Sequence, residues 1–167
     1  GLGDVYKRQG LVADTGFLYH PPAYLLVEAA YIKLAGLTNA DRLTALFSVR
    51  YLNVFFSAAT ASVLLLFGRK LHSYKAGLIT AALFLMDPYV QRINRRDMLE
   101  TFAMLCVILG IYIFFTHRQR LEKWQWLGSG VAFGVAVLTK EAMFLPLLAL
   151  LGVVAWTRRT QLTDAVR

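Results

Sequence analysis

Cysteine and charge are both scarce in this sequence of 167 residues. A single Cys excludes a disulfide framework and a zinc site built from cysteines. Only 17% of the residues are charged, whereas 57% are hydrophobic and the mean hydropathy is +0.52. Soluble globular domains carry roughly 25% charged residues. An ordinary soluble domain is therefore not expected, and the apolar content also excludes a disordered chain.

Acidic residues are fewer than basic ones, so the chain has a formal net charge of +8 at pH 7. In a soluble protein this charge would indicate binding to nucleic acid. In a chain this apolar it indicates the excess of Lys and Arg that membrane proteins keep on their cytoplasmic side. We therefore expect membrane lipids as partners and no nucleic acid. The sequence also lacks a glycine-rich phosphate loop, zinc-ligand spacings and a Ser/His/Asp order.

The first nine residues, GLGDVYKRQ, differ from the rest of the chain. They include a hexapeptide at 4–9 that resembles the translation of a transposon-end adapter used in sequencing libraries. We therefore exclude 1–9 from the fold prediction as a sequencing-adapter artefact. If 1–9 are an artefact, we expect the natural protein to continue upstream of Gly10. We also expect the tail at 158–167 to be truncated.

Long apolar runs dominate the remaining sequence and predict an all-α, multi-pass transmembrane helix bundle, because a bilayer-spanning helix needs about 20 apolar residues. The expected spans are 51–68, 76–90, 98–116, 124–139 and 142–157. Glu28 and Lys33 interrupt a further apolar stretch at 21–36, which predicts an amphipathic helix lying at the membrane surface. Asp41 is a plausible N-cap for the helix that follows.

Basic residues predict the orientation of these spans. Three Lys or Arg residues fall in each of the segments 68–76, 117–123 and 158–167, whereas the links 88–97 and 139–146 together hold four. The positive-inside rule places the first group in the cytoplasm, including a cytoplasmic tail at 158–167. The segment 10–50 is then an extracytoplasmic loop that carries the interfacial helix.

Three polar clusters fall on the predicted outer face: Tyr19–Pro22, residues 92–100 and Thr139–Glu141. Ionisable residues at membrane depth usually face a cavity, so these clusters are candidates for a functional site. Asp97 and Glu100 share one face of a helix, where two carboxylates could divide acid and base roles or bind a divalent cation. Favourable interaction with the helix dipole is the alternative explanation for both acids.

Arginines at 92, 95 and 96 lie in an outward loop, against the positive-inside bias. Guanidinium groups bind phosphate through two hydrogen bonds, which would suit an anionic lipid headgroup. Solvated loop charges are the alternative. Arg50 could likewise bind phosphate or be an ordinary interface residue whose charge reaches the water.

His20 precedes two prolines, which restrict its backbone to extended conformations and would present the imidazole rigidly. A structural role is the alternative for a lone His. Lys140 and Glu141 could line the site as an ion pair, or they could only separate two helices.

These motifs, in this order, resemble the multi-span glycosyltransferases that use lipid-linked sugars. These enzymes are the protein O-mannosyltransferase family and its bacterial relatives, including the aminoarabinose transferases of lipid A. The resemblance covers about residues 10 to 157 and depends on the order and spacing of Tyr19-His20-Pro21-Pro22, Lys33-Leu34-Ala35-Gly36, Arg50, Gly68-Arg69-Lys70-Leu71, Arg95-Arg96-Asp97-Met98-Leu99-Glu100 and Leu138-Thr139-Lys140-Glu141.

The resemblance implies a GT-C fold in the cell membrane, with a large first outer loop. It implies transfer of a sugar from a polyprenyl-phosphate donor to an acceptor protein or glycolipid at the extracytoplasmic face. Asp97 or Glu100 matches the second acidic site and would be the ligand of a divalent metal, if one takes part. The expected donor-phosphate ligands are His20 and Arg50, by similarity, and Arg95, Arg96 and Lys140, by charge.

One element of the family pattern is missing. The main catalytic acid of the family lies in the first outer loop, well before the His-Pro-Pro stretch, and Asp14 is too close to His20 to be that residue. We therefore expect the full-length protein to be an enzyme and this chain alone to be inactive. The alternative function is a transporter or lipid flippase subunit, which would have paired broken helices meeting at the midplane of the membrane.

Overall fold

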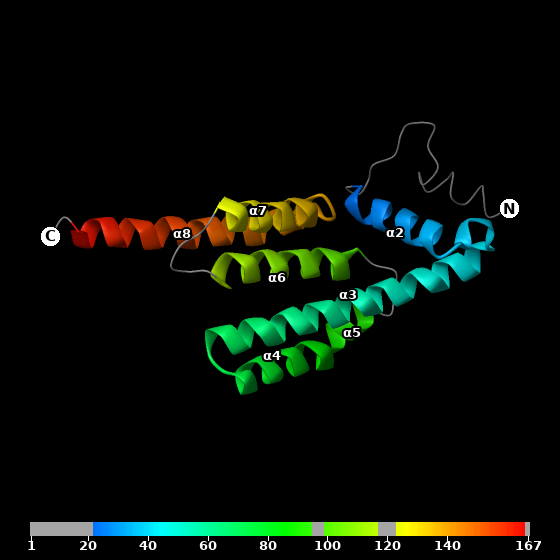
Figure 1. Ribbon diagram of the computed structural model, residues 1–167, viewed down its shortest axis with the longest axis horizontal. Coiled ribbons are helices and arrows are strands. Elements are labelled where there is room, and N and C mark those ends of the chain that lie inside the picture. The colour runs from blue at the N-terminus through cyan, green and yellow to red at the C-terminus, as the bar shows by residue number, and fades with distance from the viewer. Residues whose placement is uncertain (1–21, 95–98, 117–122, 166–167) are drawn as a thin grey trace.

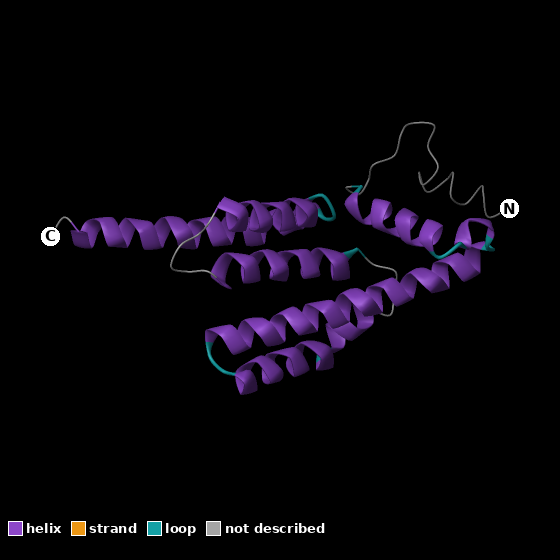
Figure 2. Cartoon of the chain, in the orientation of Figure 1, coloured by secondary structure: helices purple, strands orange, loops and turns teal. Residues whose placement is uncertain are grey.

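The computed structural model of the protein describes residues 22–94, 99–116 and 123–165, and these residues form helices and short connections (Figures 1 and 2). The helices in chain order are α2 (Ala23–Leu34), η1 (Leu37–Asn39), α3 (Arg42–Leu71), α4 (Tyr74–Met86), α5 (Pro88–Asn94), α6 (Glu100–Thr116), α7 (Lys123–Val137), η2 (Glu141–Met143) and α8 (Phe144–Ala165). The described part of the chain contains no strand, which confirms the prediction of an all-α protein.

Helix α3 is the one described helix that is long and apolar enough, by length and composition, to cross a membrane. Its 30 residues extend for roughly 45 Å, more than the hydrocarbon core of about 30 Å. Only 28% of its apolar window is buried inside the protein, unlike the core helix of a soluble domain. The apolar helices at Tyr74–Met86, Glu100–Phe115 and Glu141–Trp156 are shorter, so the five expected spans stay a prediction.

The span expected at 51–68 lies within a longer helix that begins at Arg42. The Asp41 carboxylate accepts hydrogen bonds from the main-chain N–H groups of Leu43 and Thr44, both at 3.1 Å, which confirms the predicted N-cap. The 10–50 loop therefore includes the first two turns of α3. Arg50 lies inside this helix rather than at its start.

The span expected at 76–90 is two helices, because α4 ends at Met86 and α5 begins at Pro88. Proline lacks an N–H and disfavours a helical conformation in the residue before it. Asp87 is accordingly extended, and its carboxylate accepts hydrogen bonds from the N–H groups of Tyr89 and Val90 at 2.7 and 3.0 Å. At the other end of the chain, α8 continues past the expected end of the last span to Ala165.

The N-cap of α3 should make the start of this helix sensitive to acid. Hydrogen bonds from the hydroxyl and main-chain N–H of Thr44 lower the pKa of Asp41 below its ordinary value of 3.8. A carboxyl with a lower pKa in the folded state stabilises that state above its unfolded pKa, and this stabilisation is lost as the pH falls through the folded pKa. We expect faster hydrogen exchange at the start of α3 below about pH 4.

Asp41→Asn is the control, because its amide oxygen still accepts the capping hydrogen bonds but does not titrate. Hydrogen exchange of the Leu43 and Thr44 amides, corrected for intrinsic rates, should therefore rise with acid in the wild type and stay level in the variant. Equal acid dependence of the two proteins would contradict the assignment.

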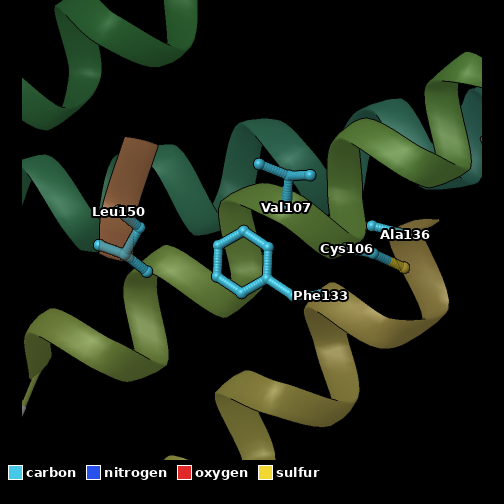
Figure 3. Packing of buried hydrophobic residues seen from close by; sticks show 5 residues of the cluster. All are labelled: Cys106, Val107, Phe133, Ala136 and Leu150. Atoms are coloured by element: carbon cyan, nitrogen blue, oxygen red, sulfur yellow. The ribbon is translucent and has the colours of Figure 1, made fainter. Parts of the chain in front are cut away.

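Helices α6 and α7 pack against each other around a small apolar core. Figure 3 shows this cluster, to which α8 also contributes: Cys106, Val107, Phe133, Ala136 and Leu150. The Ser129 hydroxyl of α7 adds a hydrogen bond of 2.9 Å to the carbonyl oxygen of Gly110 in α6. Because the two helices run in opposite directions, the start of α6 and the end of α7 lie at the same end of the pair (Figure 1).

Candidate functional site

An ion pair joins the start of α6 to the connection that follows α7. Lys140 Nζ donates to Glu100 Oε1 at 2.6 Å, across 40 positions of sequence. Glu100 is the first residue of α6, where the helix dipole favours a carboxylate. Lys140 has an extended backbone (φ −152°, ψ 121°) just before η2. Two predicted site residues from different polar clusters are therefore in direct contact.

The ion pair is half-buried, with 35% of the Lys140 side chain and 24% of the Glu100 side chain exposed. The sequence suggested an ion pair between Lys140 and Glu141. In the structure Lys140 binds Glu100 instead, and Glu141 is exposed on η2. Removing one partner of such a pair leaves a charge in partly dehydrated surroundings without compensation. The pair therefore places a carboxylate and an ammonium group side by side at this end of the helices.

Arg50 lies in α3 with its guanidinium group over an aromatic ring. Its Cζ is 4.6 Å from the centroid of the Phe47 ring, within the range of a cation–π interaction. Its Nε is buried and finds no hydrogen-bond acceptor among the described residues. A buried donor without a partner costs about 1–3 kcal/mol, so this N–H would gain from an acceptor such as a phosphate oxygen.

Through its first turn, helix α2 contacts the end of the helix pair where α6 begins and α7 ends. The Ala23 N–H donates to the carbonyl oxygen of Leu138 at 3.1 Å, just before Lys140. The Tyr24 hydroxyl donates to Asn53 Oδ1 at 3.1 Å, and both side chains are buried. In Figure 1 the start of α2 accordingly lies beside the end of α7 and the start of α6.

Sequence reasoning did not identify Tyr24 and Asn53. The signal that could have identified this contact was an asparagine within an apolar run. Burying an amide group in apolar surroundings costs free energy unless the group forms hydrogen bonds. Other predicted site residues, His20, Arg95, Arg96 and Asp97, lie outside the described residues, so their roles stay predictions. Within the described ranges no group of three or more His, Cys, Asp or Glu side chains could hold a metal.

Residues 19–166 match the sequence profile of the dolichyl-phosphate-mannose-protein mannosyltransferases. The chain belongs to this family. The match includes every described helix and confirms the resemblance to GT-C glycosyltransferases. No curated protein and no solved structure matches the chain. The protein is thus a mannosyltransferase-like chain of a membrane-associated family. Its ion pair between Glu100 and Lys140 lies at one end of the apolar helices α6 and α7.

Proposed function

We propose that the full-length protein transfers a sugar from a polyprenyl-phosphate-linked donor to a protein, lipid or glycan acceptor at the extracytoplasmic face of the cell membrane. The family match supports transferase chemistry in general. The observation that carries the proposal is the Glu100–Lys140 pair, which puts a cation and a carboxylate together where the first turn of α2 meets α7.

The reaction needs positive charge at the leaving group. A catalytic carboxylate takes the proton of the acceptor nucleophile, which attacks the anomeric carbon. The bond between this carbon and the phosphate oxygen breaks, and the lipid phosphate leaves with the bonding electrons. Cations placed at that oxygen stabilise the developing charge. Lys140 suits this role because an ammonium group has three N–H donors, so that one can bind Glu100 and another the phosphate.

Arg50 supplies a second cation, and its buried Nε–H has no hydrogen-bond acceptor among the described residues. We assign His20, Arg95 and Arg96 to the same phosphate. Their side chains would add the charge that Lys140 alone does not supply, because the carboxylate of Glu100 neutralises it.

Glu100 holds the ammonium group of Lys140 and forms the second acidic site together with Asp97. A divalent metal at Glu100 would lie beside the ammonium group of Lys140, which is 2.6 Å from Oε1 and would repel a second cation. The arrangement among the described residues therefore fits a cationic phosphate site better than a metal centre. A metal held mainly by Asp97 stays a separate proposal.

The direct test uses the full-length protein in liposomes with a polyprenyl-phosphate donor whose mannose is radiolabelled. We expect label to move to an acceptor fraction of membrane proteins or glycolipids, with release of an equal amount of polyprenyl phosphate. Movement of the donor between leaflets without sugar transfer would support the transporter alternative. Absence of both activities across several donor sugars would contradict the proposal.

A further inference from the structure

We infer that Tyr24 is a positioning residue, whose hydroxyl holds the start of α2 against α3, α6 and α7 and so keeps the cationic side chains of the site in register. Its effect on donor binding depends on the proposed function above. Its effect on the placement of α2 does not.

Tyr24 is the buried residue of α2. Its side chain is 4% exposed, whereas Leu25, Leu26 and Leu34 of the same helix are 50–87% exposed. Pro22, at the N-cap of α2, provides no side-chain hydrogen bond. The N–H of Ala23, which a helix start normally leaves without a partner, is instead bound by the Leu138 carbonyl. The first turn of α2 is therefore held both by α3 and by the end of α7.

The two hydrogen bonds of this first turn reach residues that are close in sequence to proposed site residues. Asn53, the acceptor of the Tyr24 hydroxyl, follows Arg50 by one turn of α3. Leu138, the acceptor of the Ala23 N–H, is two residues before Lys140.

The third contact of this turn is aromatic. The Tyr24 ring lies 6.2 Å from the ring of Phe102, between centroids. Phe102 is two residues after Glu100 in α6, and its ring is in turn 4.8 Å from that of Phe56 in α3. The first turn of α2 therefore connects the three helices that carry Arg50, Glu100 and the segment of Lys140.

Burial makes the Tyr24–Asn53 hydrogen bond specific. Asn53 is 0% exposed, and a buried amide must satisfy its polar atoms within the protein. A shift of α2 along α3 would separate the hydroxyl from Oδ1, so the bond selects one position of the helix. Removing it lowers the fraction of molecules with α2 docked, and the apparent affinity for a ligand falls by the same fraction.

Tyr24→Phe tests this inference, because it removes the hydroxyl and keeps the ring against Phe102. In the full-length protein we expect the KM for the lipid-linked donor to rise about five-fold, with kcat changed less than two-fold. Tyr31→Phe, at a partly buried tyrosine of the same helix, is the matched control and should leave both constants unchanged. Combining Asn53→Leu with Tyr24→Phe should raise KM by less than the product of the two separate effects, because both changes remove the same hydrogen bond.

The position of α2 is measured separately, without donor. The variant carries Ala23→Cys and Leu138→Cys, and all other cysteines are replaced. It is treated with a short bifunctional thiol reagent that links the two new cysteines. We expect Tyr24→Phe to slow cross-linking several-fold and Tyr31→Phe to leave it unchanged.

Unchanged cross-linking in Tyr24→Phe would overturn the inference, and so would slower cross-linking with an unchanged KM, which would indicate a purely structural contact. If the wild type transfers no sugar while Tyr24→Phe still slows cross-linking, the proposed function fails and the docking role of Tyr24 is supported.

Discussion

Replacing Lys140 with Met should lower the kcat of sugar transfer by about 10²–10³-fold, the effect of removing one group that stabilises a developing negative charge. An ion pair fixes the position of this cation, because Glu100 Oε1 binds Lys140 Nζ at 2.6 Å. Glu100→Gln should have a smaller effect, because the amide oxygen still accepts a hydrogen bond but no longer fixes the ammonium group by charge. Initial rates with a radiolabelled lipid-linked donor measure both effects.

Charge exchange separates the structural role of this pair from its chemical role. The double variant Glu100→Lys with Lys140→Glu restores an ion pair between α6 and η2. In detergent it should therefore unfold at a higher temperature than Glu100→Lys alone, although below the wild type, because a lysine at the start of α6 is unfavourable to the helix dipole. It should nevertheless stay as inactive as Lys140→Met, because the cation has moved. Lys75→Met, at an exposed lysine of α4, is the control for loss of a positive charge. Full activity in Lys140→Met, or in the exchanged variant, would refute the assignment.

Gly77→Ala should destabilise the protein by about 2–3 kcal/mol, the cost of inserting atoms into a contact that has no room for them. Helices α3 and α4 meet at Gly68 and Gly77. A Cβ at Gly77 would lie 2.3 Å from the carbonyl oxygen of Leu65 and 2.9 Å from the main-chain nitrogen of Arg69. Both obstacles are backbone atoms of α3, so relief requires the two helices to move apart.

Thermal unfolding in detergent measures this cost, with Gly134→Ala in α7 as the matched control. A Cβ at Gly134 meets nothing within 4 Å, and alanine favours a helix more than glycine does. The control should therefore unfold at the wild-type temperature or slightly above it, whereas Gly77→Ala unfolds well below. Equal midpoints for the two variants would show that α3 and α4 do not meet as closely as the structure has them.

Membrane proteins of this kind use small residues where helices approach closely, because lipid offers no hydrophobic drive to hold helices together. Three glycines lie in α7, but a Cβ at Gly130 or Gly134 would meet nothing within 4 Å, and one at Gly128 would make only an ordinary contact with Ile113. The close approach occurs at Gly68 and Gly77 instead. Composition revealed that glycines were available in apolar helices, but it did not reveal which of them face another helix.

The sequence alone determined the features that depend on residues a few positions apart. Apolar composition predicted an all-α protein, and Asp41 was predicted as an N-cap. The break between α4 and α5 at Asp87 and Pro88 has an equally local cause, although the expected span at 76–90 continued through it. Capping hydrogen bonds and the missing N–H of proline act within one turn, so they can be inferred from local order. The order of motifs similarly predicted the family, which the match over 19–166 confirms.

Only the tertiary structure decided which distant residues meet. Lys140 is bound to Glu100 across 40 positions of sequence rather than lying beside its neighbour Glu141 as a pair. Tyr24 reaches Asn53 across 29 positions, and neither residue stood out as a site residue beforehand. Such contacts depend on how α2, α3, α6 and α7 pack, and packing is set by the shapes of whole helix faces, which no local pattern of residues specifies.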